Sequence, residues 1–71
     1  MTDFGLEEYV GTLEFVESIL EKARRGQWSL TTPERLSAWL EDQRAHPAQT
    51  GLERISAIGN AALVMMGEVV K

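Results

Sequence analysis

The sequence predicts an all-α fold in which three helices, at about residues 4–25, 33–45 and 51–70, form one domain of 71 residues. Three observations support this fold class. Apolar residues recur at steps of three and four, helix-start motifs precede the second and third segments, and no stretch alternates apolar and polar residues as a half-buried strand does. We expect the two longer helices, the first and the third, to pair as an antiparallel hairpin that the short middle helix bridges.

The first predicted helix has matching signals at both ends. Asp3 is its expected N-cap, and Gly26 is expected to end it in a left-handed conformation. Between them, apolar residues follow the 3-4-3-4-3 spacing of a helix that pairs lengthwise with another: Leu6, Tyr9, Leu13, Val16, Leu20 and Ala23. Val10 widens this apolar surface on one side, and Phe15 and Ile19 widen it on the other. We therefore expect the helix to be buried along one broad face.

The middle helix has two start signals, and the sequence does not choose between them. Thr31 forms a capping box with Glu34, whereas capping by Thr32 places Pro33 in the first helical position, where its missing amide proton costs nothing. Pro47 ends the helix at about residue 45, because it disfavours the helical conformation of the residue before it. The large apolar residues of this helix are Leu36, Trp39 and Leu40. So narrow a face predicts a surface helix that lies on the other two.

The third helix is expected to start at a capping box formed by Thr50 and Glu53. In this motif the Thr50 hydroxyl accepts a hydrogen bond from the Glu53 amide, and the Glu53 side chain accepts one from the Thr50 amide. Residues 56–67 carry no charge, so the helix is apolar or small nearly all the way round. Its 3-4-3-4-3 pattern repeats that of the first helix and is expected to face it: Leu52, Ile55, Gly59, Ala62, Met66 and Val69.

The apolar surface of the two long helices exceeds what the middle helix can cover. An uncovered surface of this kind is typical of a protein interface, and small chains without disulfides often depend on association. We therefore expect a homodimer formed mainly by the last helix and one flank of the first. The alternative is that a different protein covers the same surface. The expected dimer interface residues are Ile58, Ala62, Met65, Met66 and Val69.

Single polar residues and composition exclude several kinds of chemistry. The chain has no cysteine, which excludes disulfides and cysteine-based zinc sites and favours the reducing cytoplasm. His46 is the only histidine and has no second ligand at metal-binding spacing, so no metal is expected. Neither a nucleophile with a neighbouring base nor a phosphate-binding loop occurs, so we expect no catalytic residue, no cofactor and no enzymatic activity. Asn60 either bonds across a symmetric interface or is exposed or bonded locally.

The net charge of −4 and the pI near 4.8 disfavour binding to nucleic acid and to anionic membranes. No signal-peptide pattern is recognised, and the charge-free run of the last helix is shorter than the roughly 18 to 20 residues of a membrane span. Three helices are compatible in outline with a helix-turn-helix, but the third offers few side chains that contact bases or phosphates. The only basic cluster is Lys22, Arg24 and Arg25. Favourable charge at a helix end explains it.

By exclusion, the sequence predicts a small acidic protein that docks on a larger protein and regulates or inhibits it, like the anti-activators and modulators of bacteria and phages. Trp28, Trp39 and Phe15 are the candidate partner-binding residues, because large aromatic side chains are enriched at binding hot spots. For both tryptophans, the alternative is a place at the edge of the core. Two other functions remain open: a nucleic-acid-linked regulator such as a repressor or antitoxin, and a structural subunit of a larger assembly.

Overall fold

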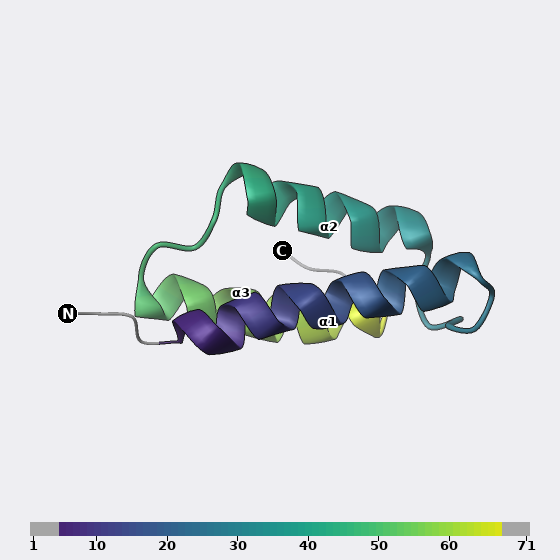
Figure 1. Ribbon diagram of the computed structural model, residues 1–71, viewed down its shortest axis with the longest axis horizontal. Helices are drawn as coiled ribbons and strands as arrows, with labels where there is room; N and C mark the ends of the chain where they lie inside the picture. Colours follow the sequence, from purple (N-terminus) through teal and green to yellow (C-terminus); the bar gives the residue numbers. More distant parts are fainter. Residues whose placement is uncertain (1–4, 68–71) are drawn as a thin grey trace.

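Three helices form an elongated bundle of 42 × 22 × 18 Å. The computed structural model describes residues 5–67, and within them the helices are α1 (Leu6–Arg24), α2 (Pro33–Ala45) and α3 (Gly51–Met65) (Figure 1). No strand occurs in this part of the chain. The expectation of an all-α fold is therefore confirmed.

Glycines in the left-handed conformation flank α1 at both ends. Gly5, with a φ of 77°, precedes the first turn, and no side chain of residues 5–67 caps this end. The expected N-cap, Asp3, lies outside the described residues. At the other end Gly26 has a φ of 76°, and the Gln27 amide donates to the Lys22 carbonyl at 2.8 Å. This bond belongs to a Schellman motif, so the expected left-handed terminator is confirmed.

Threonine caps fix the starts of α2 and α3. Thr32 caps α2, because its hydroxyl accepts a hydrogen bond from the Arg35 amide at 3.3 Å, and Pro33 takes the first helical position. The second of the two expected registers is therefore the correct one. Thr50 caps α3 and accepts from the Glu53 amide at 3.1 Å. The return bond of the expected capping box is different, since the Glu53 carboxylate accepts from the amide of residue 49 at 2.9 Å rather than from that of Thr50.

The loop between α1 and α2 and the first turn of α2 hold the end of α3, which lies at Met65 rather than at the expected residue 70. Trp28 Nε1 donates to the Met65 carbonyl at 2.9 Å, and Arg35 Nη1 donates to the Gly67 carbonyl at 3.0 Å. Carbonyls at and just beyond the helix end, where no partner within the helix remains, thereby gain donors. Gly67 has a φ of 83°, and a Cβ added there would lie 2.2 Å from the Leu30 carbonyl oxygen. Glycine is therefore required at the point where α3 stops.

The two long helices run in the same direction, so the expected antiparallel pairing of the first and third helices is wrong (Figure 1). At one end of the bundle Gly5 lies beside Arg54, because a Cβ added to Gly5 would be 3.5 Å from the Arg54 Cβ. At the other end Trp28 bonds to Met65, as described above. The physical reason is that the chain reverses twice: α2 runs back beside α1, and the loop after α2 completes the return to the end where α1 begins (Figure 1). α2 is therefore the antiparallel neighbour of both long helices.

The core lies where the three helices meet. Four of the α1 positions expected to be buried, Tyr9, Val16, Leu20 and Ala23, are buried, while Leu13 is half-buried and Leu6 is exposed. Ile19, expected on a flank, is fully buried because two helices, not one, pack on α1. The buried core cluster consists of Val16, Ile19, Leu20, Ala23, Leu36, Leu40, Ala61 and Val64.

α3 turns the opposite side toward the core from the one expected. Its buried residues are Arg54, Ala57, Ala61 and Val64. The 3-4-3-4 row that was expected to face the first helix is exposed instead, with Leu52 at 81% and Met66 at 59% of their full exposure. Small side chains on the inner side let the α3 backbone approach both α1 and α2, which the larger row would prevent. The prediction of which side packs inward is therefore wrong.

Candidate protein-binding surface

An apolar row on the outer side of α3 is the most distinctive surface of the molecule. We call it the α3 stripe, and its members are Leu52, Ile55, Gly59, Ala62 and Met66. All five are exposed, and they follow a 3-4-3-4 spacing. Because an α-helix turns by about 100° per residue, this spacing keeps them on one side, opposite the buried Ala57, Ala61 and Val64. The stripe has the pattern of a helix-pairing surface but has no helix of its own chain against it.

The positions on either side of the α3 stripe carry no charge. Ser56 and Leu63 border it on one side, and Ile58 and Met65 border it on the other. Leu63 is 41% exposed, so it extends the apolar surface. Exposed contiguous apolar surface of this kind is typical of a binding surface.

Phe15 of α1 belongs to the same side of the molecule. Glu17 pairs with Arg44 of α2, so the Glu17 side of α1 faces α2. Phe15 lies about 160° around the helix from Glu17, on the flank away from α2, and its side chain is 55% exposed. On α3, Ser56 lines a groove that α2 also lines. Ile55 lies about 100° around the helix from Ser56, on the side nearer to α1. We call this combined surface the apolar face: the α3 stripe together with Leu63 and Phe15.

The structure distributes the expected dimer residues between this surface and its edge. Ala62 and Met66 are exposed on the α3 stripe, whereas Ile58 and Met65 are half-buried beside it, and Met65 packs against the core cluster. Val69 lies outside the described residues. Sequence reasoning missed Leu52 and Ile55 as surface residues, because it assigned the whole row to contact with the first helix. Their role in dimerisation stays a prediction.

The candidate partner-binding aromatic residues fall into two groups. Trp28 and Trp39 are half-buried and pack against the core cluster, and Trp28 also bonds to the end of α3. Their place in the bundle is therefore explained by packing within the chain. Phe15 is the exposed one of the three.

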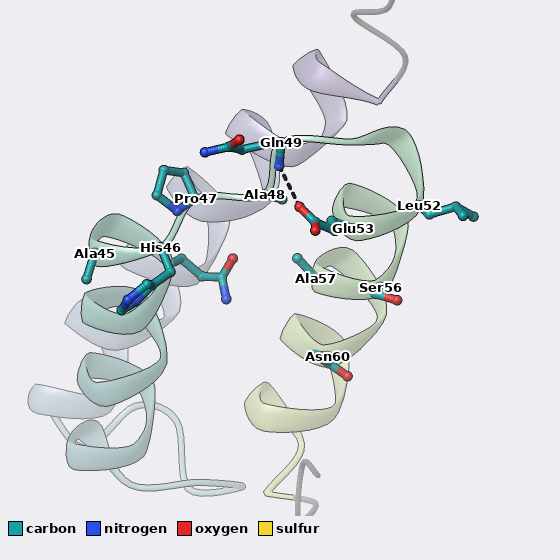
Figure 2. A pocket seen from close by; sticks show the side chains of 11 residues that line it. Ala45, His46, Pro47, Ala48, Gln49, Leu52, Glu53, Ser56, Ala57 and Asn60 are labelled. Carbon is teal, nitrogen blue, oxygen red and sulfur yellow. Dashed lines mark hydrogen bonds between the residues drawn. The ribbon is translucent and has the colours of Figure 1, made fainter.

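A groove of about 610 Å³, lined by both polar and apolar side chains, lies between the end of α2, the following loop and α3. Figure 2 shows His46 and Pro47 on the α2 side of this groove, with Ser56 and Asn60 on α3 opposite them. Two residues of its lining are bonded to α1, since the Tyr9 hydroxyl donates to Gln43 Oε1 at 2.8 Å and accepts from the backbone amide of residue 48 at 3.2 Å. Asn60 is half-buried and lines this groove together with Leu52 of the α3 stripe. Its role at a symmetric interface stays a prediction.

The parallel course of α1 and α3 separates charge along the bundle. The exposed acidic residues Glu7, Glu8 and Glu53 lie in the first turns of these two helices, at one end. The exposed basic residues Lys22, Arg24 and Arg25 lie at the end of α1, at the other. Arg24 pairs with Glu21 and faces α2, but Glu8 and Lys22 lie one heptad before and after Phe15 and so share its side of α1. The apolar face therefore has an acidic residue near one end and a basic residue near the other.

Two further features concern only residues 5–67. No group of three histidine or carboxylate side chains comes close enough together to hold a metal ion. No helix is long and apolar enough to cross a membrane.

Searches against known protein families, curated proteins and solved structures found no match to the chain.

Proposed function

We propose that this chain is a small protein-binding regulator or inhibitor that docks on a larger protein through its apolar face. The observation that carries this proposal is that α3 turns its large apolar side chains away from its own bundle. Close packing within the bundle explains why small residues face inward, but it does not explain why Leu52, Ile55 and Met66, which face outward, are large and apolar rather than polar. Their exposure is explained if another polypeptide covers them in the functional state, and the proposed setting is a bacterial or phage-infected cytoplasm.

The size of the apolar face fits this role. Fully burying a large aliphatic side chain contributes about 1.5 to 3 kcal/mol. Five large side chains of the face are at least two-fifths exposed: Phe15, Leu52, Ile55, Leu63 and Met66. Scaled by these exposed fractions, their burial contributes about 4 to 9 kcal/mol, against a cost of association of roughly 4 to 15 kcal/mol. The apolar face therefore supplies a large part of the free energy that association requires.

The position of the basic residues weighs against the nucleic-acid alternative. Arg54 is the only base within α3, and it is 8% exposed and turned toward the bundle. The outer side of α3 therefore offers no cation to a phosphate, although phosphate contacts supply most of the affinity of nucleic-acid binders. The structural-subunit alternative uses the same apolar face and differs in being a permanent assembly.

A capture experiment with matched variants tests the proposed function. The tagged protein, its Ile55→Lys variant and its Val10→Lys variant are used as baits in extract of the native host. Val10 is an exposed apolar residue on the Glu17 side of α1, away from the apolar face. We expect one protein to stay bound to the native bait and to Val10→Lys through a salt wash, and to be lost with Ile55→Lys. Equal retention by all three baits would exclude the apolar face as the docking surface.

A further inference from the structure

We propose that the α3 stripe pairs with the α3 stripe of a second copy of this chain, in antiparallel orientation, with the two-fold axis passing near Gly59 and Ala62. This inference rests on the proposed function, because it names a partner for the same surface. Self-pairing and docking on a larger protein then exclude each other. The free protein hides its apolar face in a dimer, and the larger protein binds the monomer.

The heptad pattern of the outer surface supports helix pairing. Leu52, Gly59 and Met66 occupy one of the two core positions of a heptad repeat, and Ile55 and Ala62 occupy the other. The buried residues of α3 lie on the reverse side, so α3 can serve both packings at once. A second helix would meet a complete row that runs the length of α3.

The absence of charge beside the α3 stripe indicates what kind of helix fits. In coiled coils, charged residues beside the core positions choose the partner and its orientation. The corresponding residues here are Ser56, Ile58, Leu63 and Met65. A partner helix with charges at these positions would bury them against apolar side chains without a counter-charge, which is costly. α3 of a second copy brings an equally uncharged surface and avoids this cost.

The centre of the α3 stripe leaves room for close approach. Gly59 is an exposed mid-helix glycine, and a Cβ added there would have no heavy atom within 4 Å. Glycine weakens a helix interior, and nothing in this chain requires it at this position. In the antiparallel arrangement Gly59 of one copy lies beside Ala62 of the other, while Ile55 lies beside Met66. The small pair at the centre allows the backbones to approach, and the large pairs fill the space on both sides of it.

Charge decides between the two orientations. Glu8 and Lys22 are the charged residues on the Phe15 side of α1, one heptad before and after it. A parallel pair would place Glu8 of one copy beside Glu8 of the other. An antiparallel pair places Glu8 of each copy beside Lys22 of the other. Opposite charges are then adjacent, and the dipoles of the paired helices also oppose each other. The overall charge of −4 makes this arrangement more important, since two copies otherwise repel.

The area that a dimer needs extends beyond α3. A standard interface buries about 800 Å² per partner, which is roughly a sixth of the 4884 Å² that the bundle exposes. One helix of 15 residues is about 22 Å long and does not provide this area alone. Phe15, on the α1 flank beside the α3 stripe, supplies the neighbouring apolar contact.

Sedimentation equilibrium of the full chain tests the surface. We expect a dimer at micromolar concentration, with Ile55→Lys raising the dimer dissociation constant by at least about 100-fold and Val10→Lys changing it by less than about threefold. Circular dichroism of each variant checks that the helices are retained. A native protein that stays monomeric throughout this range would overturn the inference. So would a dimer that Ile55→Lys leaves intact.

A distance measurement tests the orientation, and the lack of native cysteine makes it clean. Gln49 is exposed just before α3, so a Gln49→Cys variant takes a single spin label. With the two-fold axis near Gly59 and Ala62, the two labelled positions are roughly 35 Å apart in the antiparallel dimer and under about 20 Å in a parallel one. The short distance would overturn the antiparallel arrangement. A monomer that still captures a larger protein would refute the dimer alone, and a dimer that captures nothing would refute the proposed function alone.

Discussion

The two sides of α3 have the same helical spacing but opposite surroundings. The inner side consists of Arg54, Ala57, Ala61 and Val64, and all four are buried. The outer side carries larger apolar residues, and they are exposed. Apolar size alone would reverse these positions. The difference teaches that in a bundle of three short helices the room available between backbones decides which side packs inward.

The largest expected effect is the difference in stability lost when two leucines are truncated, one that packs against the inner side of α3 and one on its outer side. Leu36 of α2 is 0% exposed and belongs to the core cluster with Ala61 and Val64, whereas Leu52 is 81% exposed. We expect Leu36→Ala to lower the free energy of unfolding by about 2 to 5 kcal/mol, through lost burial and a residual cavity. Leu52→Ala should change it by less than about 0.5 kcal/mol.

Urea denaturation in the Ile55→Lys background measures both changes, because self-association then does not add to the stability. Since a chain of this size is only marginally stable, Leu36→Ala is expected to unfold at a much lower urea concentration than the Ile55→Lys background. Equal losses for the two leucines would show that α3 packs with its outer side inward, contrary to the structure.

The next effect compares two adjacent alanines on opposite sides of α3. Ala61 is 0% exposed, and Ala62 is exposed on the α3 stripe. Ala61→Leu inserts bulk where α3 approaches the other helices, and we expect it to cost about 1 to 3 kcal/mol. Ala62→Leu should leave the monomer's stability unchanged within about 0.5 kcal/mol. The same denaturation experiment measures both, and a stable Ala61→Leu variant would contradict the close approach on the inner side.

Local sequence signals were sufficient to predict where α2 and α3 begin and where α1 ends, because helix caps depend on neighbouring residues. Thr32, Thr50 and Gly26 act on amides and carbonyls within one turn, and their roles follow from the sequence apart from the choice between Thr31 and Thr32. The orientation of α1 relative to α3 depends on the path of the whole chain, which helical spacing does not encode. The end of α3 depends on a contact with Leu30, more than thirty residues away, so Gly67 was assigned to the helix.

The candidate surface could be predicted only in part for the same reason. The excess of apolar residues on α3 is visible in its composition, and it correctly indicates that some of them lack cover within the chain. Which residues these are depends on the rotation of α3 against two neighbours. Two rows at helical spacing were available, and size favoured the wrong one. For Trp28 the sequence left binding to a partner and packing at the edge of the core both open, and the side chain packs within the bundle. It donates a hydrogen bond to a backbone carbonyl, and no sequence pattern indicates that contact.

A smaller loss of stability is expected at the α1–α2 loop, which contacts the end of α3. Trp28→Phe keeps most of the packing but removes the donor to the Met65 carbonyl. We expect a loss of about 1 kcal/mol, the usual net contribution of such a bond. Trp39→Phe is the matched control, because no hydrogen bond of the Trp39 side chain occurs among residues 5–67, and it should cost less. Thermal unfolding of the two variants in parallel compares them, and equal losses would assign the effect of Trp28 to ring size.

The smallest expected effect is a change that raises the stability of the monomer and lowers the affinity of the dimer. Gly11 and Gly59 are both exposed mid-helix glycines with nothing within 4 Å of an added Cβ. Alanine at either position is expected to raise the stability of the monomer by about 0.5 to 1 kcal/mol, because it favours the helix. Only Gly59 lies on the α3 stripe, so only Gly59→Ala should weaken the dimer, by keeping the two backbones apart. Thermal unfolding and sedimentation of both variants measure the two effects separately. If Gly59→Ala stabilised the fold and left the dimer as strong as Gly11→Ala does, the outer side of α3 would not be used for close helix pairing.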